Sequence, residues 1–143
     1  MKVKRVQEDL VSSMQKWQKI EDASMLSTAA VMAKTGSPFI RLVMGIIQRD
    51  SQTHYLVQEW IEDSLTTKPV SLTQDELNEV WKMIEEHVKL EKQMVEIVKT
   101  ALGCVKGNKM AIQEYLLDYL QEDEIKHNSL LKRLAAIRKD MLM

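Results

Sequence analysis

Apolar residues recur every three or four positions through most of the chain, a pattern typical of amphipathic helices. Glycine and proline interrupt it in three short stretches, residues 34–38, 66–73 and 103–108. The interruptions divide the chain into predicted helices near residues 4–34, 38–64, 74–105 and 109–141. Two of these starts carry capping signals. Ser37 precedes Pro38, and Thr73 is followed three positions later by Glu76, as in a capping box.

Composition narrows the class of protein. The chain has 143 residues, with only four glycines and two prolines, which favours a single all-α domain over residues 1–143. Twenty basic and 21 acidic residues nearly balance, so we expect neither a nucleic-acid partner nor a membrane surface. No stretch has the roughly 20 apolar residues of a membrane span. One cysteine and a charged N-terminus without a signal-peptide core predict a cytoplasmic location.

Polar residues interrupt the apolar stripe of every predicted helix. In the fourth helix, Glu124 and His127 stand between Leu120 and Leu131. The other interruptions are Glu21 in the first helix, Asp50 and His54 in the second, and His87 and Glu91 in the third. All three histidines of the chain belong to this set.

These residues are predicted to lie at matching distances from the turns that join their helices, and therefore close together in a bundle. Glu91 and Glu124 each lie about 16 residues from the turn that joins their helices, so both should be ~24 Å from that end. The same reasoning places Glu21 level with Asp50. Because an unpaired buried charge costs several kcal/mol, such a layer is expected to pair, to change protonation or to bind a cation. Mixed carboxylate and imidazole ligands suit iron, manganese or zinc.

These residues resemble the ferritin-like di-iron carboxylate proteins, and among them the rubrerythrin-like branch. The likeness rests on Glu-x-x-His at Glu124 and His127, on Glu91 lying 33 residues before Glu124, and on Glu21 lying 33 residues before His54. It implies a dimetal centre in the core of a four-helix bundle. Three residues before His54 the family has glutamate, whereas this chain has Ser51.

Two forms of the site follow from this departure. Either Asp50 replaces the missing glutamate of a dinuclear centre, or a mononuclear site forms from the second half of the chain. The residues of that mononuclear site are His87, Glu91, Glu124 and His127.

The resemblance also implies a topology and a reaction. A ferritin-like bundle needs a link that returns along the bundle between the second and third helices, and a simple up-down-up-down bundle is the alternative. The implied protein is an iron or manganese oxidoreductase of peroxidase or ferroxidase type that reacts with oxygen or peroxide, with zinc as an alternative metal. The chain lacks the cysteine-ligated iron domain of rubrerythrins, so redox turnover requires an external electron donor.

Two other functions stay open. One is a non-enzymatic helical interaction protein in which the polar layer fixes the bundle register. The other is a ferritin-like domain whose metal site has degenerated. Whichever function holds, a homodimer is a possible assembly, because a bundle with exposed Met and Trp often has a partner.

Overall fold

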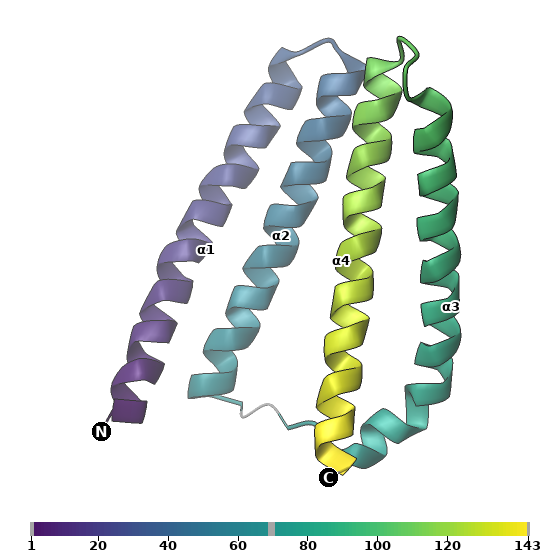
Figure 1. Cartoon of the computed structure of the whole chain (residues 1–143). Coiled ribbons are helices and arrows are strands. Elements are labelled where there is room, and N and C mark those ends of the chain that lie inside the picture. Colours follow the sequence, from purple (N-terminus) through teal and green to yellow (C-terminus); the bar gives the residue numbers. More distant parts are fainter. Residues whose placement is uncertain (1, 69–70, 143) are drawn as a thin grey trace. The chain divides into compact units, whose positions relative to one another are not determined.

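A computed structural model of the chain describes residues 2–68 and 71–142. These residues form four helices and no strand, which confirms the all-α class. The helices are α1 (Lys2–Lys34), α2 (Pro38–Thr66), α3 (Gln74–Val105) and α4 (Ala111–Leu142) (Figure 1). Their bounds agree with the predicted helices to within two residues at each end. Pro69 and Val70, in the link between α2 and α3, lie outside the described residues.

Both predicted capping signals are formed. The Ser37 side chain accepts a hydrogen bond from the backbone N–H of Ile40, with Pro38 in the first turn of α2. At the start of α3, the backbone N–H of Glu76 donates to Thr73 Oγ1, and the Glu76 carboxylate accepts from the backbone N–H of Thr73. These bonds satisfy N–H groups that an α-helix leaves without partners in its first turn.

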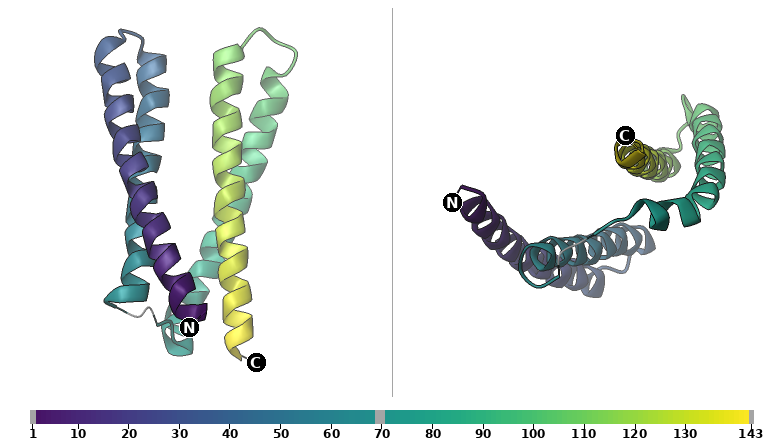
Figure 2. Two further views of the ribbon diagram at one scale, coloured as in Figure 1. Left: turned by 90° about the vertical axis from the view of Figure 1, so that its left-hand side faces the viewer. Right: turned by 90° about the horizontal axis from the view of Figure 1, so that it is seen from below.

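The contacts within the chain divide it into two compact units, residues 1–71 and 72–143. Each unit is an antiparallel helical hairpin, α1 with α2 and α3 with α4, and each is described here by itself. The two helices of each hairpin lie side by side in every view (Figures 1 and 2).

The seam of the α1–α2 hairpin repeats every seven residues. Its buried residues on α1 are Met14, Glu21 and Thr28, and on α2 Ser51 and Gln58 share the same spacing. A repeat of seven keeps one narrow stripe of each helix turned toward its partner, as in coiled coils. Most of this buried stripe is polar.

The α3–α4 hairpin has a more apolar seam on one helix. Leu77, Glu91, Val98 and Val105 are buried on α3, again at multiples of seven, whereas no residue of α4 is fully buried. At one end Arg138 of α4 stacks over the Trp81 ring.

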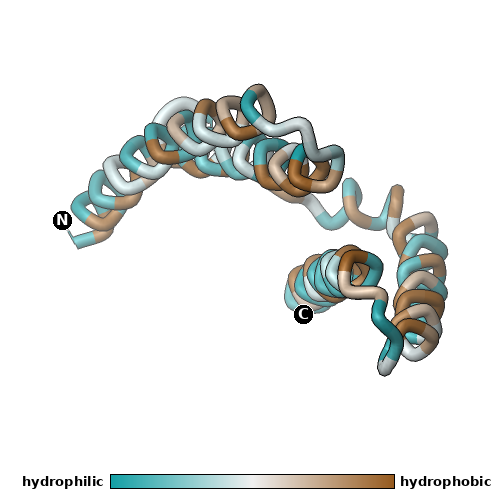
Figure 3. The backbone as a smooth tube through the Cα atoms, turned by 90° about the horizontal axis from the view of Figure 1, so that it is seen from above, coloured by the Kyte–Doolittle hydropathy of each residue, from teal (hydrophilic) through white to brown (hydrophobic). Residues whose placement is uncertain are grey.

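Much apolar surface stays exposed on both hairpins. Hydrophobic and hydrophilic residues alternate along each helix without a single continuous block of either (Figure 3). Among the described residues only four hydrophobic side chains are buried, those of Met14, Leu77, Val98 and Val105. None of the described helices combines the length and the apolar character that a membrane crossing requires.

Candidate metal centre

Glu91 is the centre of the polar layer in the α3–α4 hairpin. It takes the place of an apolar residue in the seam, and its side chain is only 5% exposed. One of its carboxylate oxygens, Oε1, lies 3.0 Å from Nε2 of His87, which precedes it by one helical turn. The same oxygen lies 3.4 Å from Nδ1 of His127 on α4. Two imidazoles therefore approach one oxygen of a buried carboxylate.

Glu124 and His127 bring the second helix into this layer. They are three residues apart, which puts both on the face of α4 that meets α3, and Nδ1 of His127 lies 3.7 Å from Oε2 of Glu124. Glu91, Glu124 and His127 each offer one ligand atom, and these atoms all lie within 4.8 Å of one another. The predicted match in height between Glu91 and Glu124 is thus confirmed. His87 contacts Glu91 but is outside this group of three.

Two carboxylate oxygens of the layer have no hydrogen-bond partner. Oε2 of Glu91 and Oε2 of Glu124 are both buried and accept no hydrogen bond within the described residues. A buried carboxylate oxygen without a donor costs the free energy of its lost hydration. With both carboxyl groups ionised, the α3–α4 hairpin would hold more negative charge than its own donors satisfy, so the two groups either share a proton or bind a cation.

The two carboxyl groups respond to each other. A hydrogen bond with Glu124 lowers the pKa of Glu91, against the effect of burial, and His87 and His127 lower it further. The same hydrogen bond, burial and the charge of Glu91 raise the pKa of Glu124. The pair thus favours one shared proton over two negative charges.

The polar layer of the α1–α2 hairpin is built differently. Glu21 is buried, and its Oε2 accepts a hydrogen bond of 3.1 Å from the side-chain amide of Gln58. Nδ1 of His54 lies 3.3 Å from the same oxygen, with the histidine side chain 56% exposed. The hairpin brings together Glu21 and His54, as the resemblance implies, and adds an amide donor that the sequence analysis did not single out.

Asp50 and Ser51 have neighbours other than those that a count of residues from the turn suggests. Glu21 was expected to lie level with Asp50, but it meets His54 and Gln58 instead. Helical side chains lean toward the N-terminus of their own helix, so a residue of α1 meets one that lies further along α2 than the count from the turn suggests. Asp50 is half-buried, and its side chain makes no hydrogen bond or ion pair within the described residues. Ser51 is buried, and its hydroxyl lies 2.8 Å from that of Ser24.

Gln58 and Ser24 are the residues of this layer that the sequence analysis missed. Gln58 is only 3% exposed, seven residues after Ser51 and four after His54. A spacing of seven residues places Gln58 on the same buried stripe as Ser51. Once the seven-residue repeat is known, this spacing identifies Gln58 as a residue of the layer.

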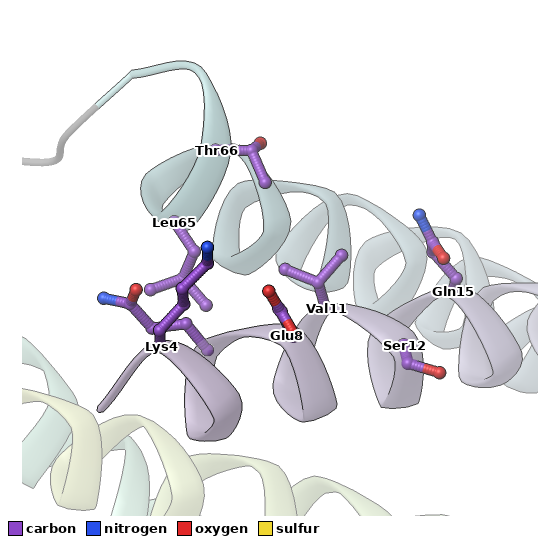
Figure 4. A pocket seen from close by; sticks show the side chains of 8 residues that line it. Lys4, Glu8, Val11, Ser12, Gln15, Leu65 and Thr66 are labelled. Atoms are coloured by element: carbon purple, nitrogen blue, oxygen red, sulfur yellow. The ribbon is translucent and has the colours of Figure 1, made fainter. Parts of the chain in front are cut away.

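A shallow groove of the α1–α2 hairpin lies apart from these layers. It is formed by the first half of α1 and the end of α2 (Figure 4), and none of its lining residues belongs to the predicted site. Its lining carries one lysine, Lys4, and one glutamate, Glu8, and no histidine. The groove therefore does not extend either polar layer.

The donor set of the α3–α4 hairpin fits a transition-metal ion. Two carboxylates and one imidazole are ligands that iron, manganese and zinc accept. The orphaned Oε2 atoms of Glu91 and Glu124 supply free lone pairs, and three protein ligands leave coordination positions open. A cation would also relieve the repulsion that raises the pKa of Glu124.

Comparisons with family models, with curated proteins and with solved structures find no match for this chain.

Proposed function

We propose that the protein binds a transition-metal ion in the α3–α4 hairpin, through Glu91, Glu124 and His127. One observation carries the proposal: the ligand atoms of these three residues, the buried Glu91 and the half-buried Glu124 and His127, lie within 4.8 Å of one another. The likeness to rubrerythrin-like proteins adds support through the same Glu and Glu-x-x-His positions. Iron and manganese suit the donors best, with zinc as the alternative.

The charges of the layer support a cation better than they support a purely structural network. A structural network is stable when each of its buried polar atoms has a partner, whereas here Oε2 of Glu91 and Oε2 of Glu124 receive no hydrogen bond from a nitrogen or hydroxyl group of the described residues. His87 donates to Oε1 of Glu91 in the tautomer that carries its proton on Nε2, and so leaves Oε2 free for a metal. Ligating carboxylates are commonly held by hydrogen bonds of this kind.

Oxidation chemistry is the activity that we propose for the bound ion. Iron or manganese held by Glu91, Glu124 and His127 would supply the redox chemistry for a reaction with oxygen or peroxide. The protein binds the ion, neutralises its charge with Glu91 and Glu124, and limits water through the buried seam. A soluble electron donor, outside this chain, completes the turnover.

Metal content tests the proposal directly. Protein purified without chelator is analysed for iron, manganese and zinc, as the wild type and with Glu124→Ala and His127→Ala combined. The matched control changes two exposed residues of the same helix, Glu122→Ala with Lys132→Ala. We expect stoichiometric metal in the wild type and the control, and its loss from the site variant.

The opposite result would be decisive. Wild-type protein that stays helical without metal, and whose melting temperature is unchanged by added iron, manganese or zinc, contradicts metal binding. Peroxide consumption by the metal-loaded protein in the presence of a chemical reductant then tests the oxidoreductase activity separately.

A second candidate is a helical interaction protein, and a different observation favours it. Met83, Leu90 and Ile97 of α3 recur every seven residues and stay 72%, 50% and 68% exposed. Such a stripe is typical of a helix that packs against a partner helix. Size-exclusion chromatography with light scattering, for the wild type and for Ile97→Glu, tests this candidate. A monomer in both cases would rule out self-association through the stripe.

A further inference from the structure

The two hairpins carry their polar residues at matching positions. Glu21 of α1 corresponds to Glu91 of α3, because each contacts a histidine of the second helix, at 3.3 Å from His54 and 3.4 Å from His127. Three residues before those histidines stand Ser51 in α2 and Glu124 in α4. The hairpins therefore differ at the position where the second carboxylate would be.

A second difference lies four residues after the histidines. Gln58 occupies this position in α2 and Leu131 occupies it in α4. Gln58 is buried and donates to Glu21 Oε2 at 3.1 Å, whereas a leucine has no hydrogen to donate to Glu91. The negative charge of Glu21 is thus stabilised by an amide of the protein, and that of Glu91 is not.

The remaining candidates for ligands in the α1–α2 hairpin do not restore the missing carboxylate. Ser51 is engaged with Ser24 at 2.8 Å, and a neutral hydroxyl is a weak ligand for iron or manganese. Asp50 is half-buried, one position away from Ser51, whereas the partners of Glu21 are Gln58 and His54. The hairpin offers one carboxylate and one exposed imidazole, which are fewer ligands than transition-metal sites in proteins use.

We infer that the chain holds a single transition-metal ion, in the α3–α4 hairpin, and that Ser51 and Gln58 exclude a metal from the equivalent position of the α1–α2 hairpin. The inference rests on the proposed function and deepens it by fixing the nuclearity. With Ser51 in place of a glutamate, the hairpin lacks a second carboxylate. The Gln58 amide places an N–H donor against the oxygen of Glu21 to which a cation would bind. Glu21 then serves the packing of its hairpin and does not serve as a ligand.

The first test is a titration of chelator-treated protein with manganese(II), monitored by calorimetry. Elemental analysis after desalting then counts the bound ions per chain. We expect one ion per chain for the wild type and the same stoichiometry for Glu21→Gln, which leaves a neutral partner for Gln58. Glu91→Gln should abolish binding. Two ions per chain, or loss of an ion in Glu21→Gln, would overturn the inference while leaving the proposed function standing; no bound ion at all in the wild type would overturn the proposed function itself.

A gain of binding is the second test. Ser51→Glu combined with Gln58→Leu gives the α1–α2 hairpin the same residues that α3–α4 has at these positions. We expect the folded double variant, with wild-type helicity by circular dichroism, to bind a second manganese ion per chain. If it binds only one, Ser51 and Gln58 are not what excludes the metal. Should the double variant not fold, the stoichiometries of the wild type and of Glu21→Gln still decide the question.

Discussion

Replacing Glu124 with glutamine should separate metal binding from stability. The pKa of Glu124 is raised by its hydrogen bond with Glu91, by burial and by the charge of Glu91. A carboxyl group whose pKa is higher in the folded than in the unfolded chain makes the folded state less stable as pH rises through that interval. Above its folded pKa, the ionised Glu124 therefore opposes folding of the metal-free protein. Glutamine keeps the shape, removes the charge and can donate a hydrogen bond to Glu91.

The size of the effect follows from the distance between the ligand atoms. Two negative charges within 4.8 Å of each other repel by about 3.5 kcal/mol at an effective dielectric constant of ~20. The proton that the pair shares and the nearby His127 reduce this repulsion. We expect Glu124→Gln to stabilise the metal-free protein by about 1–2 kcal/mol, or roughly 3–8 °C in melting temperature for a chain of this length.

Thermal and urea unfolding of chelator-treated protein measure this gain. At neutral pH the variant should unfold later than the wild type. The difference should shrink as pH falls through the raised folded pKa of Glu124 and vanish only well below the ordinary glutamate value of 4.5, where the carboxyl group is protonated in both states. Added manganese should stabilise the wild type and leave Glu124→Gln unchanged. The metal-free variant is thus expected to be more stable than the wild type and to have lost the ability to bind manganese.

The control for this experiment is Glu122→Gln, the same change at an exposed position of α4. A surface charge of this kind contributes within ~0.5 kcal/mol. The reasoning would be refuted if Glu124→Gln were no more stable than Glu122→Gln at neutral pH, or if the difference did not shrink in acid. Retained stabilisation by manganese in Glu124→Gln would remove this residue from the metal site.

Three further substitutions test two contacts within the polar layers and the conformation of one turn. His87→Ala removes the 3.0 Å contact with Glu91 and should weaken manganese binding about 10- to 100-fold in calorimetry; a loss of all binding would instead make His87 a ligand. Gln58→Leu leaves buried Glu21 without its amide donor and should cost about 1–3 kcal/mol in urea unfolding, an expectation that an unchanged midpoint would contradict. Gly107→Ala, at a backbone φ of 81° in the turn after α3, should cost about 1 kcal/mol by the same measurement, and a neutral effect would mean that the turn adopts another conformation.

The sequence predicted the helices and the α3–α4 layer for physical reasons that are local. Ser37, Thr73 and Glu76 satisfy helix starts through bonds to residues only three positions away, so their effect is visible in a short window. The short turn between α3 and α4 sets the heights of Glu91 and Glu124, and counting residues from that turn was enough to bring them together.

The link between α2 and α3 could not be predicted as well. The predicted helices, 38–64 and 74–105, leave nine residues between them, whereas α2 continues to Thr66, and α3 begins at Gln74. Hydroxyls at the end of α2 bond back to the preceding turn, as Thr66 does to the carbonyl of Glu62 at 2.9 Å, and so extend the helix. The seven residues left reach ~23 Å, about half the length of α2 at ~1.5 Å per residue. The topology, ferritin-like or up-down-up-down, stays a prediction.

The α1–α2 layer shows why a stripe of interrupted positions is not by itself a set of ligands. Glu21, Asp50 and His54 interrupt their stripes in the same way as Glu91, Glu124 and His127. Glu21 accepts a hydrogen bond from the Gln58 amide, whereas Oε2 of Glu91 and Oε2 of Glu124 accept none from a nitrogen or hydroxyl group of the described residues. The difference depends on whether a donor is present one turn beyond the histidine, which no single helix reveals. Ser51 and Gln58 are therefore best understood together: loss of a carboxylate removes the need for a cation, and an amide then suffices to hold the one carboxylate that remains.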